Sequence, residues 1–207
     1  MLTLYYSPKS CALASHIMLE ESGARYEAQL VDLNGDRAEY SKINCRGTVP
    51  ALLVDGVLVT ENVAILSYIA RTYPNARLLP DSVLGEALCL SILGWCASSV
   101  HISFRMSIRP QRFTSEPQGW AGISDVGRKM FRENLQKIDA MLVAGKWLMG
   151  EQYTVADAYP LVFYAWALIG DVPVQDLQSF REFKDRMIAR PAVRSVLQRE
   201  NSVLLQA

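Results

Sequence analysis

The sequence has no excess of charge of either sign, and its few histidines and cysteines form no metal-binding motif. Its 207 residues include 21 Lys and Arg against 21 Asp and Glu. This neutral balance argues against charge-driven binding to nucleic acid or to an anionic membrane surface. The two histidines and four cysteines show neither CxxC pairs nor the spacing of a zinc site, so we expect no metal.

Long apolar runs and targeting signals are also absent. No run of 18 apolar residues occurs, so we expect no membrane span. The first residues, Met1 to Tyr6, lack a basic region followed by an apolar one and do not resemble a signal peptide. A cytoplasmic location is therefore the default expectation, and the cysteines are expected to be free thiols there.

The hydrophobic residues that are present, 50% of the chain, suffice for one large domain or two small ones. The residue pattern predicts an α/β unit over residues 1–77, a linker, and an all-helical unit over residues 85–207. In the first unit we expect strands over 2–6 and 26–33, a hairpin, and helices after Cys11, over 38–43 and over 61–73. In the second we expect helices over 85–107, 123–143, 155–168, 180–189 and 192–199.

The stretch from Thr48 to Asn62 organises the first unit. Asp55-Gly56 between two apolar runs predicts a two-residue hairpin turn. Val49-Pro50 is a bond that can be cis at modest cost, which would turn the backbone of Val49 outward to pair with an extended ligand. Glu61 and Asn62 open a helix, whose free amides favour an anion. Together these features suit a small peptide with an amino-acid-like end.

Four motifs in this order resemble those of cytosolic glutathione S-transferases. They are Tyr5 to Cys11, Gly47 to Pro50, Thr60 to Ile65, and Tyr153 to Ala158. The cysteine of the first motif and His101 resemble the bacterial beta class in particular. The resemblance implies a thioredoxin-like first domain, an all-α second domain, a cis-proline, a homodimer, glutathione as co-substrate and a role in detoxification.

The resemblance also implies roles for individual residues. The glutathione-binding candidates are Val49, Pro50, Glu61 and Asn62. The catalytic candidates from the resemblance are Cys11, His101 and Tyr6; the hydroxyl of Ser10 is a further candidate from its chemistry. Three positions depart from the family pattern, with Asn62 in place of serine or glycine, Cys45 in place of proline and Gly94 in place of asparagine.

The chemistry expected of this site is the ionisation of a thiol. Cys11 stands at a helix N-terminus, which should lower the pKa of its own thiol and of a bound glutathione thiol. Ser10 can donate a hydrogen bond to the thiolate, and His101 can take its proton. The alternatives are that Cys11 only packs under the helix and that His101 is a surface histidine. His16 and Asp157 are read as structural. Asp157 closes a capping box with Thr154 at the start of the helix over 155–168, which is apolar nearly all round and is expected to be buried.

A second site must hold the electrophile. Its candidates are Phe104, Ile108, Phe113, Tyr164 and Trp166, although aromatic residues at helical spacing are often core. Three arginines in the same region, Arg105, Arg109 and Arg112, can bind the glycyl carboxylate of glutathione or an acidic substrate, or can simply face solvent.

Three functions remain open from the sequence. The first is a transferase that joins the glutathione thiolate to small hydrophobic electrophiles. The second is a glutathione-dependent thiol-disulfide oxidoreductase that uses Cys11 through a mixed disulfide. The third is a non-catalytic protein of the same fold that binds apolar ligands, for which Asn62 and Gly94 are the main support.

Overall fold

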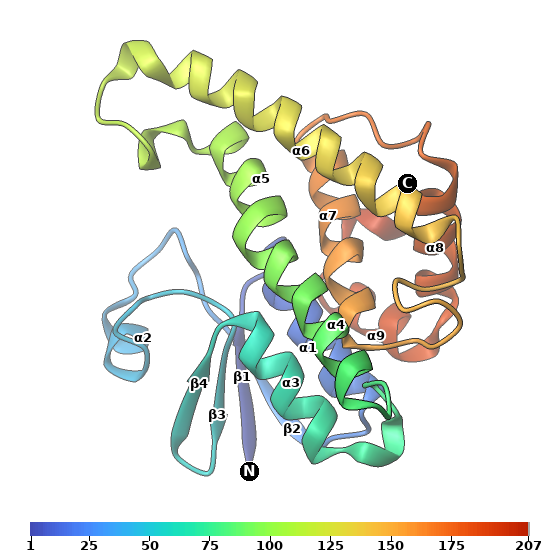
Figure 1. Ribbon diagram of the computed structural model, residues 1–207. Coiled ribbons are helices and arrows are strands. Elements are labelled where there is room, and N and C mark those ends of the chain that lie inside the picture. The colour runs from blue at the N-terminus through green and yellow to red at the C-terminus, as the bar shows by residue number, and fades with distance from the viewer. Residues whose placement is uncertain (207) are drawn as a thin grey trace.

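The computed structural model describes residues 1–206 and shows a sheet-and-helix part followed by a helical part (Figure 1). The first part contains β1 (Leu2–Tyr6), α1 (Ala12–Glu21), β2 (Tyr26–Leu30), α2 (Ala38–Ile43), β3 (Ala51–Val54), β4 (Val57–Thr60) and α3 (Asn62–Thr72). The second contains α4 (Val83–Trp95), α5 (His101–Ile108), α6 (Trp120–Leu142), α7 (Ala158–Ile169), α8 (Gln178–Ala189) and α9 (Pro191–Arg199).

The four strands form one mixed sheet in the order β2-β1-β3-β4. β1 pairs in parallel with β2, and the β1–β3 and β3–β4 pairs are antiparallel. Asp55 and Gly56 adopt φ angles of 46° and 89°, so the predicted hairpin turn is confirmed. The sheet and its helices confirm the thioredoxin-like first part, although β2 ends earlier than the predicted residue 33.

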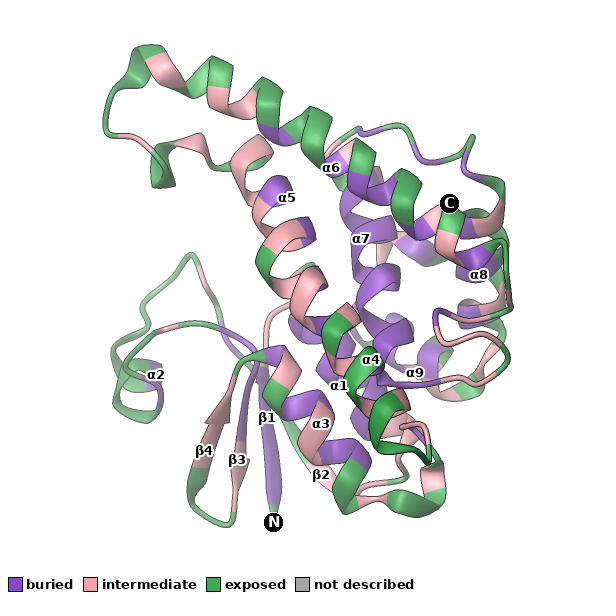
Figure 2. Ribbon diagram, viewed as in Figure 1, coloured by how far each residue is buried: buried purple, intermediate pink, exposed green. Residues whose placement is uncertain are grey.

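Alternation along β1 and β3 places two apolar layers on the two faces of the sheet. Leu4 and Leu52 lie in the large core cluster with residues of α1 and α3. Tyr5 and Ala51 face the other way and pack in a smaller cluster with Tyr40 of α2. Figure 2 shows the result, with burial concentrated around α1, β1 and α7 and exposure along α2 and the distal half of α6. The sheet is therefore covered mainly by α1 and α3.

α7 is the centre of the helical part. Its residues from Ala158 to Ala167 are all buried, which confirms the prediction of a helix that is apolar on every side. The same apolar cluster contains residues of α1 and α3, and α1 contacts α3, α7 and α9. The first part of the chain thus rests on the second through a shared core.

The predicted single helix over residues 85–107 is one helical path with an irregularity. Cys96–Val100 form a π-helical segment between α4 and α5. No residue pattern predicts such a segment, because its extra residue per turn is set by packing rather than by composition. By length and composition alone the path Val83–Ile108 is long and apolar enough to cross a membrane. In the fold, however, α4 lies against α3, and α5 lies against α6.

The turn before α7 is held by a buried carboxylate. Asp157 accepts hydrogen bonds from the backbone N–H groups of Leu148 and Thr154, both at 2.8 Å. Thr154 Oγ1 in turn accepts from the Ala156 N–H at 3.3 Å. The predicted capping box is therefore confirmed, and it also fixes the 148 loop.

We predict that Asp157→Ala lowers the free energy of unfolding by about 2–4 kcal/mol, because it leaves buried N–H groups without an acceptor. Burial raises the pKa of Asp157 to about 7. A carboxyl whose folded pKa exceeds its unfolded value of ~3.9 loses stability as pH rises through that interval. Urea unfolding should therefore show Asp157→Asn gaining on the wild type between about pH 4 and 7. A gain by the wild type over that interval would contradict this account.

Candidate functional site

The loop between β1 and α1 brings Cys11 beside Val49. Ser10 Oγ donates to the Ser7 carbonyl at 2.6 Å and accepts from the Ala12 N–H at 3.2 Å, which fixes the first turn of α1. The half-buried Cys11 thiol donates to the Val49 carbonyl oxygen at 3.6 Å. The Ser10 proton is thus held by a local carbonyl, whereas Cys11 and Val49 share one side of the site.

The backbone that precedes β3 is fixed by hydrogen bonds from two side chains at α2. The Val49-Pro50 bond is cis, which confirms that prediction. The Thr48 carbonyl accepts hydrogen bonds from Tyr40 Oη at 2.6 Å and Asn44 Nδ2 at 2.8 Å. The sequence reasoning missed these two supports, since nothing local to Tyr40 or Asn44 indicates a partner there. Within residues 1–206 no acceptor is found for the Val49 N–H, so it is available to a ligand.

The start of α3 separates two side chains that the sequence grouped together. Glu61 is exposed, has a φ of 72°, and forms an ion pair with Arg46 at 3.3 Å. Asn62 is buried; its amide oxygen accepts from Ser15 Oγ at 2.5 Å and its amide nitrogen donates to the Cys11 carbonyl at 2.8 Å. Glu61 can therefore reach a ligand, but Asn62 offers only its backbone N–H.

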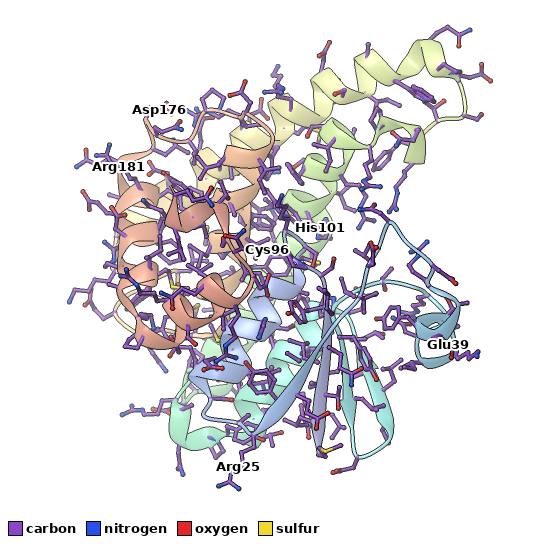
Figure 3. All side chains as sticks on the ribbon, turned by 180° about the vertical axis from the view of Figure 1, so that it is seen from behind. Arg25, Glu39, Cys96, His101, Asp176 and Arg181 are labelled. Atoms are coloured by element: carbon purple, nitrogen blue, oxygen red, sulfur yellow. The ribbon has the colours of Figure 1, made fainter. Side chains whose placement is uncertain are left out.

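His101 begins α5 directly after the π-helical segment. Arg105 Nη2 lies 3.1 Å from His101 Nε2, and because guanidinium only donates, Nε2 accepts and Nδ1 carries the proton. Burial, with the charge of Arg105, lowers the pKa of His101 to about 4. Its ring meets Trp166 edge-on at 4.8 Å. Figure 3 shows His101 close to Cys96, where α5 faces the sheet part. His101 is therefore a neutral imidazole at neutral pH.

The expectation of a lowered pKa at Cys11 is wrong for the unliganded protein. Burial raises the pKa of the Cys11 thiol to about 12, although the charge of Arg105 and a backbone hydrogen bond act in the opposite direction. The cost of desolvating a thiolate therefore exceeds the benefit of the helix N-terminus. Cys11 is a thiol at neutral pH, and as such a donor rather than a nucleophile.

Tyr6 packs against His16 of α1. Its ring lies 4.8 Å from the ring of His16, and no hydrogen bond from its hydroxyl is found among residues 1–206. His16 Nδ1 lies 2.7 Å from Glu200 Oε1 in the core, in keeping with a structural role. No cluster of three or more His, Cys, Asp or Glu side chains able to hold a metal ion is found in the described part of the chain.

The five residues expected to form the electrophile site are not all brought together. Phe104 and Trp166 are buried and stacked at 4.6 Å, and Trp166 Nε1 donates to the Lys9 carbonyl at 2.9 Å. Ile108 and Phe113 are 49% and 41% exposed at the end of α5 and in the following loop. Tyr164 is buried on another side of α7.

The position of Tyr164 is a correction to the sequence prediction. Its ring packs edge-on against Phe180 of α8 at 5.1 Å, with Lys184 Nζ 5.6 Å from the ring centroid. Tyr164 and Trp166 are two residues apart on one helix, so they point in nearly opposite directions. Of the other four candidates, Phe104 and Trp166 pack together in the core, and Ile108 and Phe113 are exposed near the end of α5.

Comparison with known proteins agrees with this geometry. Residues 1–71 match the family model described as glutathione S-transferase, N-terminal domain. Glutathione S-transferase GstA of Escherichia coli O157:H7 is 34% identical, over 96% of this chain and 98% of that protein. A glutathione transferase homologue from Sulfitobacter with bound glutathione has a TM-score of 0.89 at 26% identity, covering 96% of this chain and 98% of that one. A bacterial beta class glutathione S-transferase from Sphingomonas chungbukensis has a TM-score of 0.84 at 31% identity, covering 96% and 98%.

The raised pKa of Cys11 generates a prediction about its reactivity. Iodoacetamide attacks thiolates, so at pH 7.5 it should alkylate Cys11 at least ~10-fold more slowly than the exposed Cys45. Peptide mapping by mass spectrometry over a time course measures both rates in one sample. Faster labelling of Cys11 than of Cys45 would show that the helix N-terminus, and not burial, controls this thiol.

Proposed function

The chain belongs to the glutathione S-transferase family, and we propose that it joins the thiol sulfur of glutathione to small hydrophobic electrophiles at the N-terminus of α1. The observation that carries this proposal is the free backbone edge at Val49, with cis-Pro50, beside the Cys11 thiol. The charge of Arg105, which contacts His101, acts on that thiol. These elements supply a peptide-binding edge, a donor and a positive charge.

We expect glutathione to lie extended along this edge. Its cysteinyl backbone pairs with Val49, as an added strand pairs with a sheet edge. Its γ-glutamyl carboxylate meets the free amides at the start of α3, where the helix dipole favours an anion. Its ammonium group lies by the exposed carboxylate of Glu61. Asn62 contributes its backbone N–H, because its side chain is bonded to Ser15 and Cys11.

The thiol of glutathione is then activated by its surroundings rather than by a charged base. The neutral Cys11 thiol and the α1 N-terminus donate to the developing thiolate, and the guanidinium of Arg105 stabilises its charge. Neutral His101 fixes Arg105 through Nε2. The thiolate attacks the electrophilic carbon, and the thiol proton passes to water. The raised pKa of Cys11 weighs against the oxidoreductase alternative, because that reaction needs Cys11 as a thiolate.

The division of labour between the two parts follows from the same placement. We propose residues 1–77 as the glutathione-binding domain and residues 85–207 as the helical domain that contributes Phe104, Ile108, Phe113 and Trp166 to the electrophile side. The family resemblance supports a cytoplasmic role in detoxification.

The exposed apolar face of α4 supports a homodimer. Val83, Leu84 and Leu88 are 86%, 70% and 53% exposed, and a contiguous apolar patch of this kind marks an interaction surface. A second copy of the chain is the occupant we propose, because the family forms homodimers.

Glu61 provides the direct test of the glutathione site. Glu61→Gln should raise the Kd for glutathione roughly fivefold, about 1 kcal/mol, because the ammonium loses an exposed charged partner. Isothermal titration calorimetry with the reduced protein measures this Kd. The control is Glu39→Gln on α2, which removes the same charge at another exposed site. Equal Kd values for the two variants, or no saturable binding by the wild type, would refute the proposed site.

The dimer has a test of its own. Sedimentation equilibrium should give the wild type twice the chain mass of 23.1 kDa, and Leu84→Glu should reduce it towards the monomer by placing a charge in the apolar contact. Val126→Glu on α6 places the same charge at another exposed apolar residue, which is 51% exposed, and should leave the dimer intact. A monomeric wild type, or equal behaviour of the two variants, would overturn this proposal.

A further inference from the structure

Four arginines near the candidate site lack acidic partners. Arg105 lies on α5, Arg109 directly follows the helix, Arg112 lies in the loop to α6, and Arg37 precedes α2. Six other arginines form ion pairs with carboxylates, namely Arg46, Arg71, Arg77, Arg132, Arg190 and Arg199. Within residues 1–206 no such pair is found for the four. Five further arginines, Arg25, Arg128, Arg181, Arg186 and Arg194, also have no ion pair in the described residues. What distinguishes the four is therefore their position near the candidate site.

The charges of the other three arginines act on Arg112, although the four residues come from two parts of the chain. Partial burial and the charges of Arg105, Arg109 and Arg37 lower the pKa of Arg112, and no acidic group opposes them. Arg37 Nη1 donates to the Gly47 carbonyl at 3.2 Å, two residues before Val49. Figure 1 shows the loop after α5 on the same side of the molecule as the segment before α2. The arginines therefore bridge α5 and the glutathione edge.

The charge of one arginine in the cluster also acts on the Cys11 thiol. Arg105 contacts His101 at 3.1 Å, and its charge acts on the thiol of Cys11. Arg109 and Arg112 are exposed and lie beyond Arg105 along the chain, beside the exposed apolar side chains of Ile108 and Phe113. The charge of Arg105 thus acts near the Cys11 sulfur. Further along the chain, an exposed apolar surface lies beside the guanidinium groups of Arg109 and Arg112.

We propose that the electrophilic substrate is an organic anion whose carboxylate is held by Arg109 and Arg112. Planar guanidinium groups bind carboxylates through paired charge-assisted hydrogen bonds. The apolar body of the substrate rests on Ile108 and Phe113, so that its electrophilic carbon faces the glutathione sulfur. An anion relieves the mutual repulsion of the four arginines. This inference rests on the proposed transferase function and specifies its substrate class.

Two aryl chlorides that differ only in charge test this inference. 4-Chloro-3,5-dinitrobenzoate carries the carboxylate, and 4-chloro-3,5-dinitrobenzamide is its neutral counterpart. In both, the glutathione thiolate attacks the chlorine-bearing carbon, the sulfur–carbon bond forms, chloride leaves with its electron pair, and the thiol proton goes to solvent. No oxidant or metal takes part. The variants are Arg109→Gln, Arg112→Gln and the double variant. The control is Arg25→Gln, an exposed residue that Figure 3 shows far from His101.

We expect the wild type to have a kcat/KM at least tenfold higher for the benzoate than for the benzamide, after correction for the uncatalysed rates. The double variant should lose that preference, whereas its benzamide activity and its calorimetric Kd for glutathione should stay within twofold. Added salt should weaken the preference, and Arg25→Gln should have no effect.

Three outcomes would overturn the inference. Equal wild-type activity on both compounds means that the arginines do not select an anion. An equal fall in kcat/KM for both compounds in the double variant means that Arg109 and Arg112 have a structural role. A raised Kd for glutathione in that variant means that Arg109 and Arg112 hold the carboxylate of glutathione itself. In the first case, turnover of the benzamide with intact glutathione binding would leave the transferase function standing. If the wild type does not bind glutathione, both the transferase function and the anionic substrate class are rejected.

Discussion

The buried amide of Asn62 is the interaction on which the arrangement of the site depends. It bonds Ser15 and the Cys11 carbonyl of the first helix. One side chain thus joins the start of α3 to α1. Since a half-satisfied buried network is costly, these helices keep a fixed mutual position, and with them Cys11 and the start of α3.

Burial determines which groups of the site are neutral, and one arginine supplies its positive charge. Burial keeps Cys11 a thiol and His101 a neutral imidazole, so neither is a charged catalyst in the unliganded protein. The positive charge at the site comes from Arg105, oriented by His101. An arrangement of neutral donors and one fixed cation favours a bound thiolate without requiring a base of matched pKa. Arg105 is also the first of the three arginines that continue along the chain to the exposed Arg109 and Arg112.

Local patterns in the sequence predicted the fold well and the side-chain geometry only in part. The Asp55-Gly56 turn and the Thr154–Asp157 capping box follow from residues within four positions of each other, and both are present. The pKa of Cys11, the inward turn of Asn62 and the packing of Tyr164 on α8 depend on residues distant in the sequence. Periodicity cannot reveal such contacts, and the helix-terminus rule for Cys11 failed because burial outweighed it.

The central claim is that the site stabilises the thiolate of bound glutathione. The most direct measurement is the ultraviolet difference absorbance of that thiolate, followed as pH is varied, with the protein without glutathione as the baseline for its own four cysteines. The account predicts an apparent pKa for the bound thiol at least one unit below the ~8.5 of a free thiol, and a smaller shift when Arg105 is replaced by Gln. Saturable binding with an unshifted thiol pKa would contradict it.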